Sequence, residues 1–181
     1  MPTLHVCSLS RLHETVDRVG ATHLASLINA GTPVERPAAI RPENHLFLGF
    51  NDIVEPMDGM IPASSAQMAR FVDFIRTWDR SGPLVVHCWA GISRSTAGAF
   101  VVACTLLPQI DEAGIARGLR RLSPSATPNG RIVALADALL GRDGRMVAAI
   151  RAIGRGADAY EGAPFALPLE PEAWESGGGA P

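Results

Sequence analysis

The chain has 181 residues, of which 47% are hydrophobic and 19% are charged, and its formal net charge at pH 7 is −2. This length and apolar content suit one domain with a real core and exclude a disordered chain, while the slight acidic excess argues against a nucleic-acid partner. The longest apolar stretch, around residues 97–107, is too short to span a bilayer, and the N-terminus lacks the pattern of a signal peptide. We therefore expect a cytoplasmic protein with no membrane partner.

Strands and helices are predicted to alternate in the first half of the chain. Apolar runs bounded by turn residues predict strands at Leu4–Ser8, His23–Ile28, His45–Gly49 and Leu84–His87. Apolar residues at helical spacing predict one helix that stops at Gly20, and a second that is capped by Ser64 or Ser65 and ended by Gly82-Pro83. This order predicts a single α/β domain whose central sheet is mostly parallel and is flanked by helices.

The second half is predicted to be helical, with helices at roughly 95–107, 111–122, 129–141 and 145–154. We expect the domain to cover residues 1–156 and a Pro/Gly-rich tail to cover 157–181, packing through Phe165, Leu167 and Leu169. Two loops interrupt the first half, at 29–44 and 51–63. A loop as long as the second one is often functional in a compact domain.

Three cysteines, Cys7, Cys88 and Cys104, stand at wide spacings. Their odd number and their spacing predict neither a disulfide framework nor a metal site, and free thiols suit a reducing compartment. Cys104 lies in an apolar helical segment and is expected in the core. Cys88 stands apart from the other two because a distinctive segment follows it.

That segment is residues 87–96, His-Cys-Trp-Ala-Gly-Ile-Ser-Arg-Ser-Thr, between an apolar strand and a helix. Residues 88–94, here called the cysteine loop, end at a helix N-terminus, where free backbone N–H groups and the helix dipole favour an anion. A loop of five residues between Cys88 and Arg94 can curl until its N–H groups converge. Arg94 can then bind two phosphate oxygens. The positive electrostatic potential of the loop N–H groups and the helix N-terminus favours the thiolate form of Cys88, which lies beneath the phosphate. The segment therefore predicts a site for attack by sulfur on phosphorus.

The sequence HCWAGISRS resembles the signature His-Cys-x5-Arg-Ser/Thr of the protein tyrosine phosphatase superfamily, and its AGISRS portion is most similar to the dual-specificity branch. Residues 123–129, SPSATPN, are similar to an element of that branch, with Arg120 or Arg121 ahead of it. The resemblance implies the cysteine-phosphatase fold. It also implies a phosphatase that hydrolyses phosphomonoesters, with phosphotyrosine as the main substrate and phosphoserine or phosphothreonine as further substrates.

The resemblance implies a role for each residue around the cysteine loop. Cys88 would take the phosphoryl group, an aspartate would protonate the leaving oxygen, and water would then hydrolyse the phosphocysteine with no metal or cofactor. The phosphate would lie among Trp89, Ala90, Gly91, Ile92, Ser93 and Arg94. Ser95 would donate to the sulfur, or simply cap the helix, and His87 would support the loop from behind. Asn129 would fix the loop or orient water, or cap a helix.

Two aspartates of the 51–63 loop compete for the role of general acid. Asp58 lies 30 residues before Cys88, which matches the spacing usual in the family, whereas Asp52 lies 36 residues before it. Asp52 directly follows a strand, whose rigid end can aim the side chain at the pocket. Asp58 stands in Pro-Met-Asp-Gly, which is typical of a turn. We choose Asp52.

Three alternatives within reach of this chemistry stay open. A phosphoinositide phosphatase of the superfamily usually carries lysines in the loop, and residues 89–93 hold none. An RNA 5′-phosphatase finds little support in the acidic charge balance. A catalytically weak phosphopeptide-binding module would lack the nucleophile, the arginine or the acid. The partner we expect is a phosphorylated protein or a small phosphomonoester, and the sequence makes no prediction of the oligomeric state.

Overall fold

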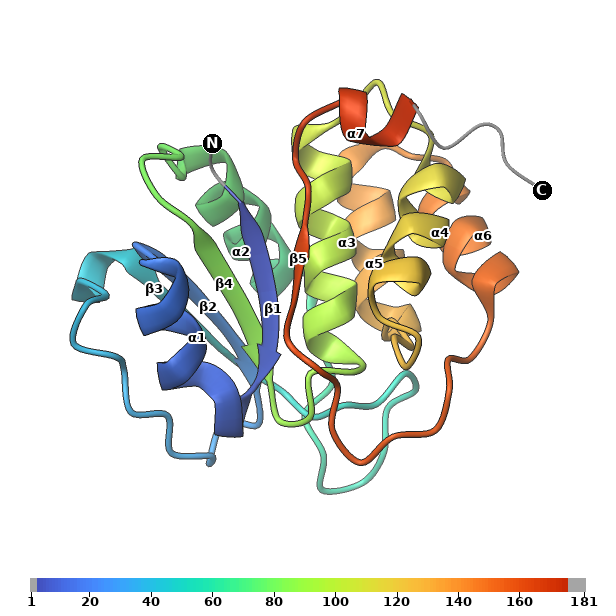
Figure 1. The fold of residues 1–181 in the computed structure, drawn as a ribbon. Helices are drawn as coiled ribbons and strands as arrows, with labels where there is room; N and C mark the ends of the chain where they lie inside the picture. Colours follow the sequence, from blue (N-terminus) through green and yellow to red (C-terminus); the bar gives the residue numbers. More distant parts are fainter. Residues whose placement is uncertain (1–2, 176–181) are drawn as a thin grey trace.

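A computed structural model describes residues 3–175, which form a five-stranded sheet with helices on both faces (Figure 1). The strands are β1 (Leu4–Ser8), β2 (His23–Ile28), β3 (His45–Gly49), β4 (Leu84–Cys88) and β5 (Phe165–Leu167). They lie in the order β3-β2-β4-β1-β5; the first four are parallel and β5 runs antiparallel to β1. The predicted α/β class with a mostly parallel sheet is confirmed.

The helices of the first half are α1 (Leu12–Val19), which follows a 3-10 turn at Leu9–Arg11, and α2 (Ser65–Thr77). Gly20 ends α1 in the left-handed conformation, as the sequence predicted. Ser64 caps α2 and exchanges hydrogen bonds with Gln67 in a capping box. The expected end of α2 at Gly82-Pro83 was wrong, because Trp78 already leaves the helix and its indole donates to the carbonyl of Gly82 at 3.1 Å.

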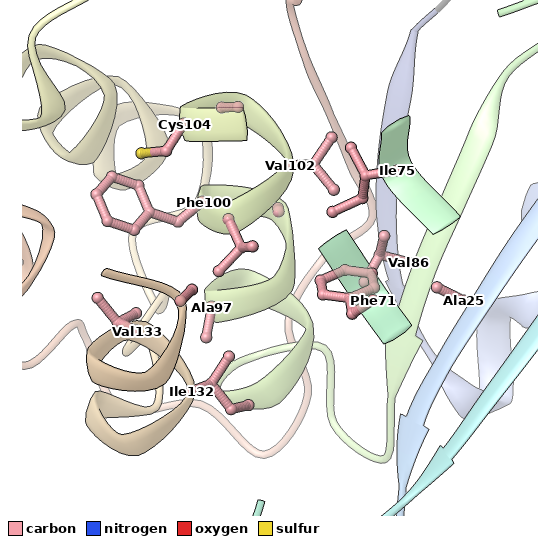
Figure 2. Packing of buried hydrophobic residues seen from close by; sticks show 14 of the residues in the cluster. Ala25, Phe71, Ile75, Val86, Ala97, Phe100, Val102, Cys104, Ile132 and Val133 are labelled. Atoms are coloured by element: carbon pink, nitrogen blue, oxygen red, sulfur yellow. The ribbon is translucent and has the colours of Figure 1, made fainter. Parts of the chain in front are cut away.

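The helices of the second half are α3 (Arg94–Leu106), α4 (Glu112–Leu122), α5 (Gly130–Leu140), α6 (Arg145–Ile153) and the short α7 (Glu172–Glu175). The first four begin and end within one residue of the predicted limits. Every residue from Arg94 to Cys104 is buried, which is typical of a central helix. Figure 2 shows Phe100 and Ala97 of α3 directed towards Val133 and Ile132 of α5, while Val102 is directed towards Ile75 of α2.

Two hydrophobic clusters lie on opposite faces of the sheet. The larger one joins the sheet to α2, α3 and the helices behind them, and includes Val6 and Val86. The smaller one lies under α1 and includes Cys7 and Val85. Alternate residues of one strand point to opposite faces, so Cys7 and its neighbour Val6 serve different clusters. Cys104 lies in the larger cluster, as expected for a core thiol.

The chain after α6 returns to the sheet, which the sequence did not predict. Phe165, Leu167 and Leu169 pack against the larger cluster as expected, but they do so by adding β5 to the edge of the sheet beside β1. Trp174 of α7 then covers Gly118 of α4, where an added Cβ would lie 2.3 Å from the indole ring. Within residues 3–175 no helix combines the length and hydropathy needed to cross a bilayer.

The parallel strands all end at the same edge of the sheet, the lower edge in Figure 1. The 51–63 loop, the cysteine loop and the segment that leads from α6 to β5 come together there. In open parallel sheets this edge is the usual place for a ligand.

Candidate active site

The cysteine loop joins the end of β4 to the start of α3. Gly91 has a φ of +72°, a left-handed conformation that favours glycine, and a Cβ there would lie 3.0 Å from the backbone nitrogen of Ser8. Its own N–H donates to Cys88 Sγ at 3.3 Å, and Ser95 Oγ lies 3.1 Å from the same sulfur. The loop thus curls around the sulfur, with Cys88 at its floor.

One edge of the Arg94 guanidinium is fixed by hydrogen bonds, whereas Nε on its other edge has no hydrogen-bond partner within residues 3–175. Nη1 donates to Asn29 Oδ1 at 2.6 Å and to the carbonyl of Phe50 at 2.8 Å. Nε is buried and has no hydrogen-bond partner within residues 3–175. It lies 3.9 Å from Asp52 Oδ2, which is too long for a hydrogen bond. A buried donor without a partner is costly, and an oxygen anion is a suitable partner for it.

Asp52 lies beside this edge of Arg94. Its Oδ1 accepts from Ser93 Oγ and from Asn129 Nδ2, each at 2.8 Å. The side chain keeps 37% of its surface exposed, and its Oδ2 makes no hydrogen bond within residues 3–175. Asn129 also caps α5, since its Oδ1 accepts from the N–H groups of Arg131 and Ile132. Asn129 therefore caps a helix and positions a carboxylate at the same time.

The position of Asp52 follows from the way in which the 51–63 loop is closed. Asn51 and Ile61 form two hydrogen bonds, from Asn51 N to Ile61 O at 2.7 Å and from Ile61 N to Asn51 Oδ1 at 2.8 Å. Asp52 lies next to this closure. Asp58 stands in the turn Met57–Met60 at the far end of the loop, where it is exposed and does not line the pocket. The structure brings Asp52 to Cys88 and Arg94, and leaves Asp58 away from them.

His87 supports the loop from behind. Its Nε2 lies 2.7 Å from Ser26 Oγ, which in turn lies 2.8 Å from His45 Nε2. Burial lowers the pKa of His87 to about 4, so the imidazole is neutral at physiological pH. A buried neutral histidine paired on the sheet has a structural position, outside the pocket.

The pocket at this edge has a volume of about 600 Å³. Its lining includes Cys88, Arg94, Asp52 and the residues Trp89, Ala90, Ile92 and Ser93. Gly91 and Ser95 are buried and do not line the pocket. Sequence reasoning missed Asn29 and Phe50, which fix Arg94, and missed Ala159 and Tyr160 of the segment after α6, which also line the pocket.

The other two cysteines do not line this pocket. Burial raises the pKa of Cys7 and of Cys104 to about 12 in each case. All three thiols are free, and Cys7 lies in the cluster under α1. Cys88 is the one thiol among residues 3–175 that lines the main pocket.

Comparison with known proteins gives a consistent result. The family model described as protein-tyrosine phosphatase matches residues 56–122, which include the cysteine loop but not Asp52. No curated protein matches this chain.

Solved structures match over most of the chain. A crystal structure of DUSP15 superposes with a TM-score of 0.62 at 18% identity, covering 84% of this chain and 91% of that one. A crystal structure of human DUSP28 superposes with a TM-score of 0.59 at 18% identity, covering 78% of this chain and 96% of that one. The PTP-2 phosphatase of Cydia pomonella superposes with a TM-score of 0.59 at 18% identity, covering 75% of this chain and 84% of that one. The chain therefore has the fold of the tyrosine and dual-specificity phosphatases, and the resemblance inferred from the cysteine loop is confirmed.

Proposed function

We propose, on the premise of this shared fold, that the chain is a cysteine-dependent phosphatase that hydrolyses phosphomonoesters. The observation that carries the proposal is that Arg94 lines the same pocket as Cys88, while its buried Nε has no hydrogen-bond partner within residues 3–175. A phosphate oxygen would supply the partner that Nε lacks, and the planar guanidinium can bind a second oxygen in the same plane.

The first chemical step is transfer to sulfur. The thiolate of Cys88 attacks phosphorus, and the bond from phosphorus to the ester oxygen breaks. Asp52 gives a proton to the leaving oxygen, using Oδ2, because Oδ1 is occupied by Ser93 and Asn129. The products of this step are the free alcohol or phenol and a phosphocysteine.

The second step is hydrolysis. Asp52, now a carboxylate, takes a proton from water while the water oxygen attacks phosphorus and the bond from sulfur to phosphorus breaks. Ser95 Oγ, 3.1 Å from the sulfur, donates to the departing thiolate. Inorganic phosphate leaves, and Arg94 with the loop N–H groups stabilises the charge in both steps, so no metal is needed.

The main pocket favours a protein or aryl phosphate over the alternatives. All 16 cationic residues other than histidine are arginines, so no lysine is available for the inositol headgroup that a phosphoinositide would present. A pure binding module would lack one of the three reacting groups, whereas Cys88, Arg94 and Asp52 line one pocket. We infer a phosphotyrosine substrate first, with phosphoserine or phosphothreonine also accepted.

Hydrolysis of p-nitrophenyl phosphate tests the proposal directly. The wild-type protein should release p-nitrophenol, and Cys88→Ser should abolish turnover while still binding vanadate or phosphate, because Arg94 and the loop amides remain. Appreciable turnover by the serine variant would rule out covalent catalysis by Cys88. Absence of turnover in the wild type would overturn the enzymatic proposal.

A further inference from the structure

The segment after α6 crosses the cysteine loop as a strap, residues 156–162. At one end, Gly156 N donates to Thr127 Oγ1 at 3.0 Å and Ala157 N donates to the carbonyl of Pro124 at 2.9 Å. At the other end, Gly162 N donates to the carbonyl of Ala90 at 2.8 Å. A Cβ at Gly162 would lie 2.7 Å from the carbonyl oxygen of Gly91, so the strap lies directly on the cysteine loop.

Glu161 of the strap is held by two serines at the end of β1. Its Oε1 accepts from the hydroxyls of Ser8 and Ser10, and Ser8 is fully buried. The hydrogen bonds from Ser10 and then Ser8 hold the pKa of Glu161 below its ordinary value. Arg11, which interacts electrostatically with Glu161, is paired with Glu14 at 3.0 Å. Glu161 therefore presents a fixed negative charge with one oxygen still available.

A second pocket, of about 220 Å³, opens beside this carboxylate. It is lined by Leu9, Ser10, Trp89, Ala90, Tyr160 and Glu161. Trp89, Ala90 and Tyr160 also line the main pocket, so the two pockets adjoin. Trp89 is 59% exposed and Tyr160 is 94% exposed, which leaves both rings free to contact a ligand.

We propose that the second pocket is a subsite for a cationic side chain, arginine or lysine, next to the phosphorylated residue of a peptide substrate. The walls are apolar and aromatic except for the serine hydroxyl and the carboxylate. They suit an alkyl chain that lies along Leu9, with its charged end between the aromatic rings and Glu161. The proposal rests on the proposed function, since the phosphate of the same peptide would occupy the main pocket.

Matched phosphotyrosine peptides test the subsite. Two sets carry arginine, norleucine or glutamate immediately before or immediately after the phosphotyrosine and are otherwise identical. In one set, kcat/KM should be higher for arginine than for norleucine by roughly 3- to 30-fold, the range expected from a cation near aromatic rings and a carboxylate. Glutamate should be the poorest of the three.

Glu161→Gln should remove most of the arginine preference, because glutamine still accepts from the serines but carries no charge. Asp158→Asn is the matched control: this strap residue does not line the second pocket, and the variant should keep the preference. Rates on p-nitrophenyl phosphate, which has no neighbouring residue, normalise each variant. Retention of the full preference by Glu161→Gln would overturn the subsite.

Binding separates this inference from the proposed function. Affinities of the same peptides for the Cys88→Ser protein, measured by fluorescence anisotropy, repeat the comparison without turnover. The same order of affinities supports the subsite even if the wild type fails to hydrolyse p-nitrophenyl phosphate, which would count against the proposed function alone. Equal affinities for the arginine and norleucine peptides in both sets would overturn the subsite, whatever the rate of hydrolysis.

Discussion

The cysteine loop follows β4 and the 51–63 loop follows β3, the two strands on either side of β2, but the two loops are held in different ways. The cysteine loop is short and is packed on the sides away from the pocket, by Ser8 at Gly91, by the strap at Gly162 and by His87 behind it. The 51–63 loop is long and largely exposed, and hydrogen bonds between Asn51 and Ile61 join its two ends. A site can therefore combine a closely packed cysteine loop with a carboxylate on an exposed loop, which is held by hydrogen bonds from Ser93 and Asn129.

Asp52→Asn tests the anchored end of the 51–63 loop and should have the largest effect. Turnover should fall by a factor of roughly 10²–10⁴, the usual contribution of general acid–base catalysis. The loss should be greater for phosphotyrosine than for p-nitrophenyl phosphate, because a poorer leaving group depends more on the acid. Asp58→Asn is the control from the exposed end, and steady-state kinetics should find it close to wild type. The reverse pattern would mean that sequence spacing, rather than this geometry, identifies the acid.

Arg94→Lys tests the cysteine loop and should reduce kcat by roughly 10²–10³-fold, as expected when a donor to the reacting group is lost. A lysine is a point charge and cannot reproduce the planar fork. It also leaves Asn29 Oδ1 and the carbonyl of Phe50 without the donor that they have now. The kinetics of p-nitrophenyl phosphate hydrolysis provide the measurement. A near-wild-type kcat would show that Arg94 does not bind the transferring phosphate.

Buried His87, which lies behind the cysteine loop, should make the free energy of unfolding fall as the pH is lowered. His87 has a pKa of about 4 in the fold, against roughly 6.5 in the unfolded chain. The unfolded chain therefore binds a proton first as the pH falls, and about 3 kcal/mol of unfolding free energy should be lost between pH 6.5 and 4.

Urea unfolding of wild type and His87→Gln across this range measures the difference in slope. Burial also lowers the pKa of His5, His23 and His45, so only the difference between the two proteins reports on His87. An NMR titration should place the His87 midpoint well below those of exposed histidines. Equal slopes for the two proteins would contradict a buried neutral His87.

The smallest predicted effect comes from removing the hydrogen bonds that Asn129 and Ser93 donate to Asp52. Asn129→Ala removes the cap of α5 and one donor to Asp52, and should lower stability by about 1 kcal/mol and turnover by less than Asp52→Asn does. Ser93→Ala removes the other donor without touching the cap, so it should lower turnover at an almost unchanged Tm. If Asn129→Ala loses stability but no activity, its contact with Asp52 has no catalytic consequence.

The sequence predicted the cysteine loop because its curl is specified by local features. A strand, a glycine in the bend and a helix start within residues 84–96 specify the curl and place Cys88 and Arg94 together. Asp52 required a choice, because distance along the chain says little about a loop that is closed at its base. The choice agrees with the position of Asp52 in the main pocket, while its role in proton transfer stays a prediction.

The residues that the sequence missed depend on strand order. Asn29 and Ser26 reach Arg94 and His87 only because β2 lies directly beside β4, and no local pattern specifies that neighbour. β5 escaped notice for a related reason. It has three residues, and its partner β1 lies at the other end of the chain. Pairings over such a distance leave no periodicity in the sequence.

The hydrogen bonds between Asn51 and Ile61 allow the residues between them to be replaced by other sequences. Because both ends of this stretch are fixed to each other, residues 54–60 can change in length or composition at little entropic cost and without shifting Asp52. Met57, Met60 and Ile61 are exposed there, and Met60 also borders the main pocket. Replacing residues 54–60 by other loop sequences would therefore change which substrates approach the main pocket, while Cys88, Arg94 and Asp52 would keep their positions.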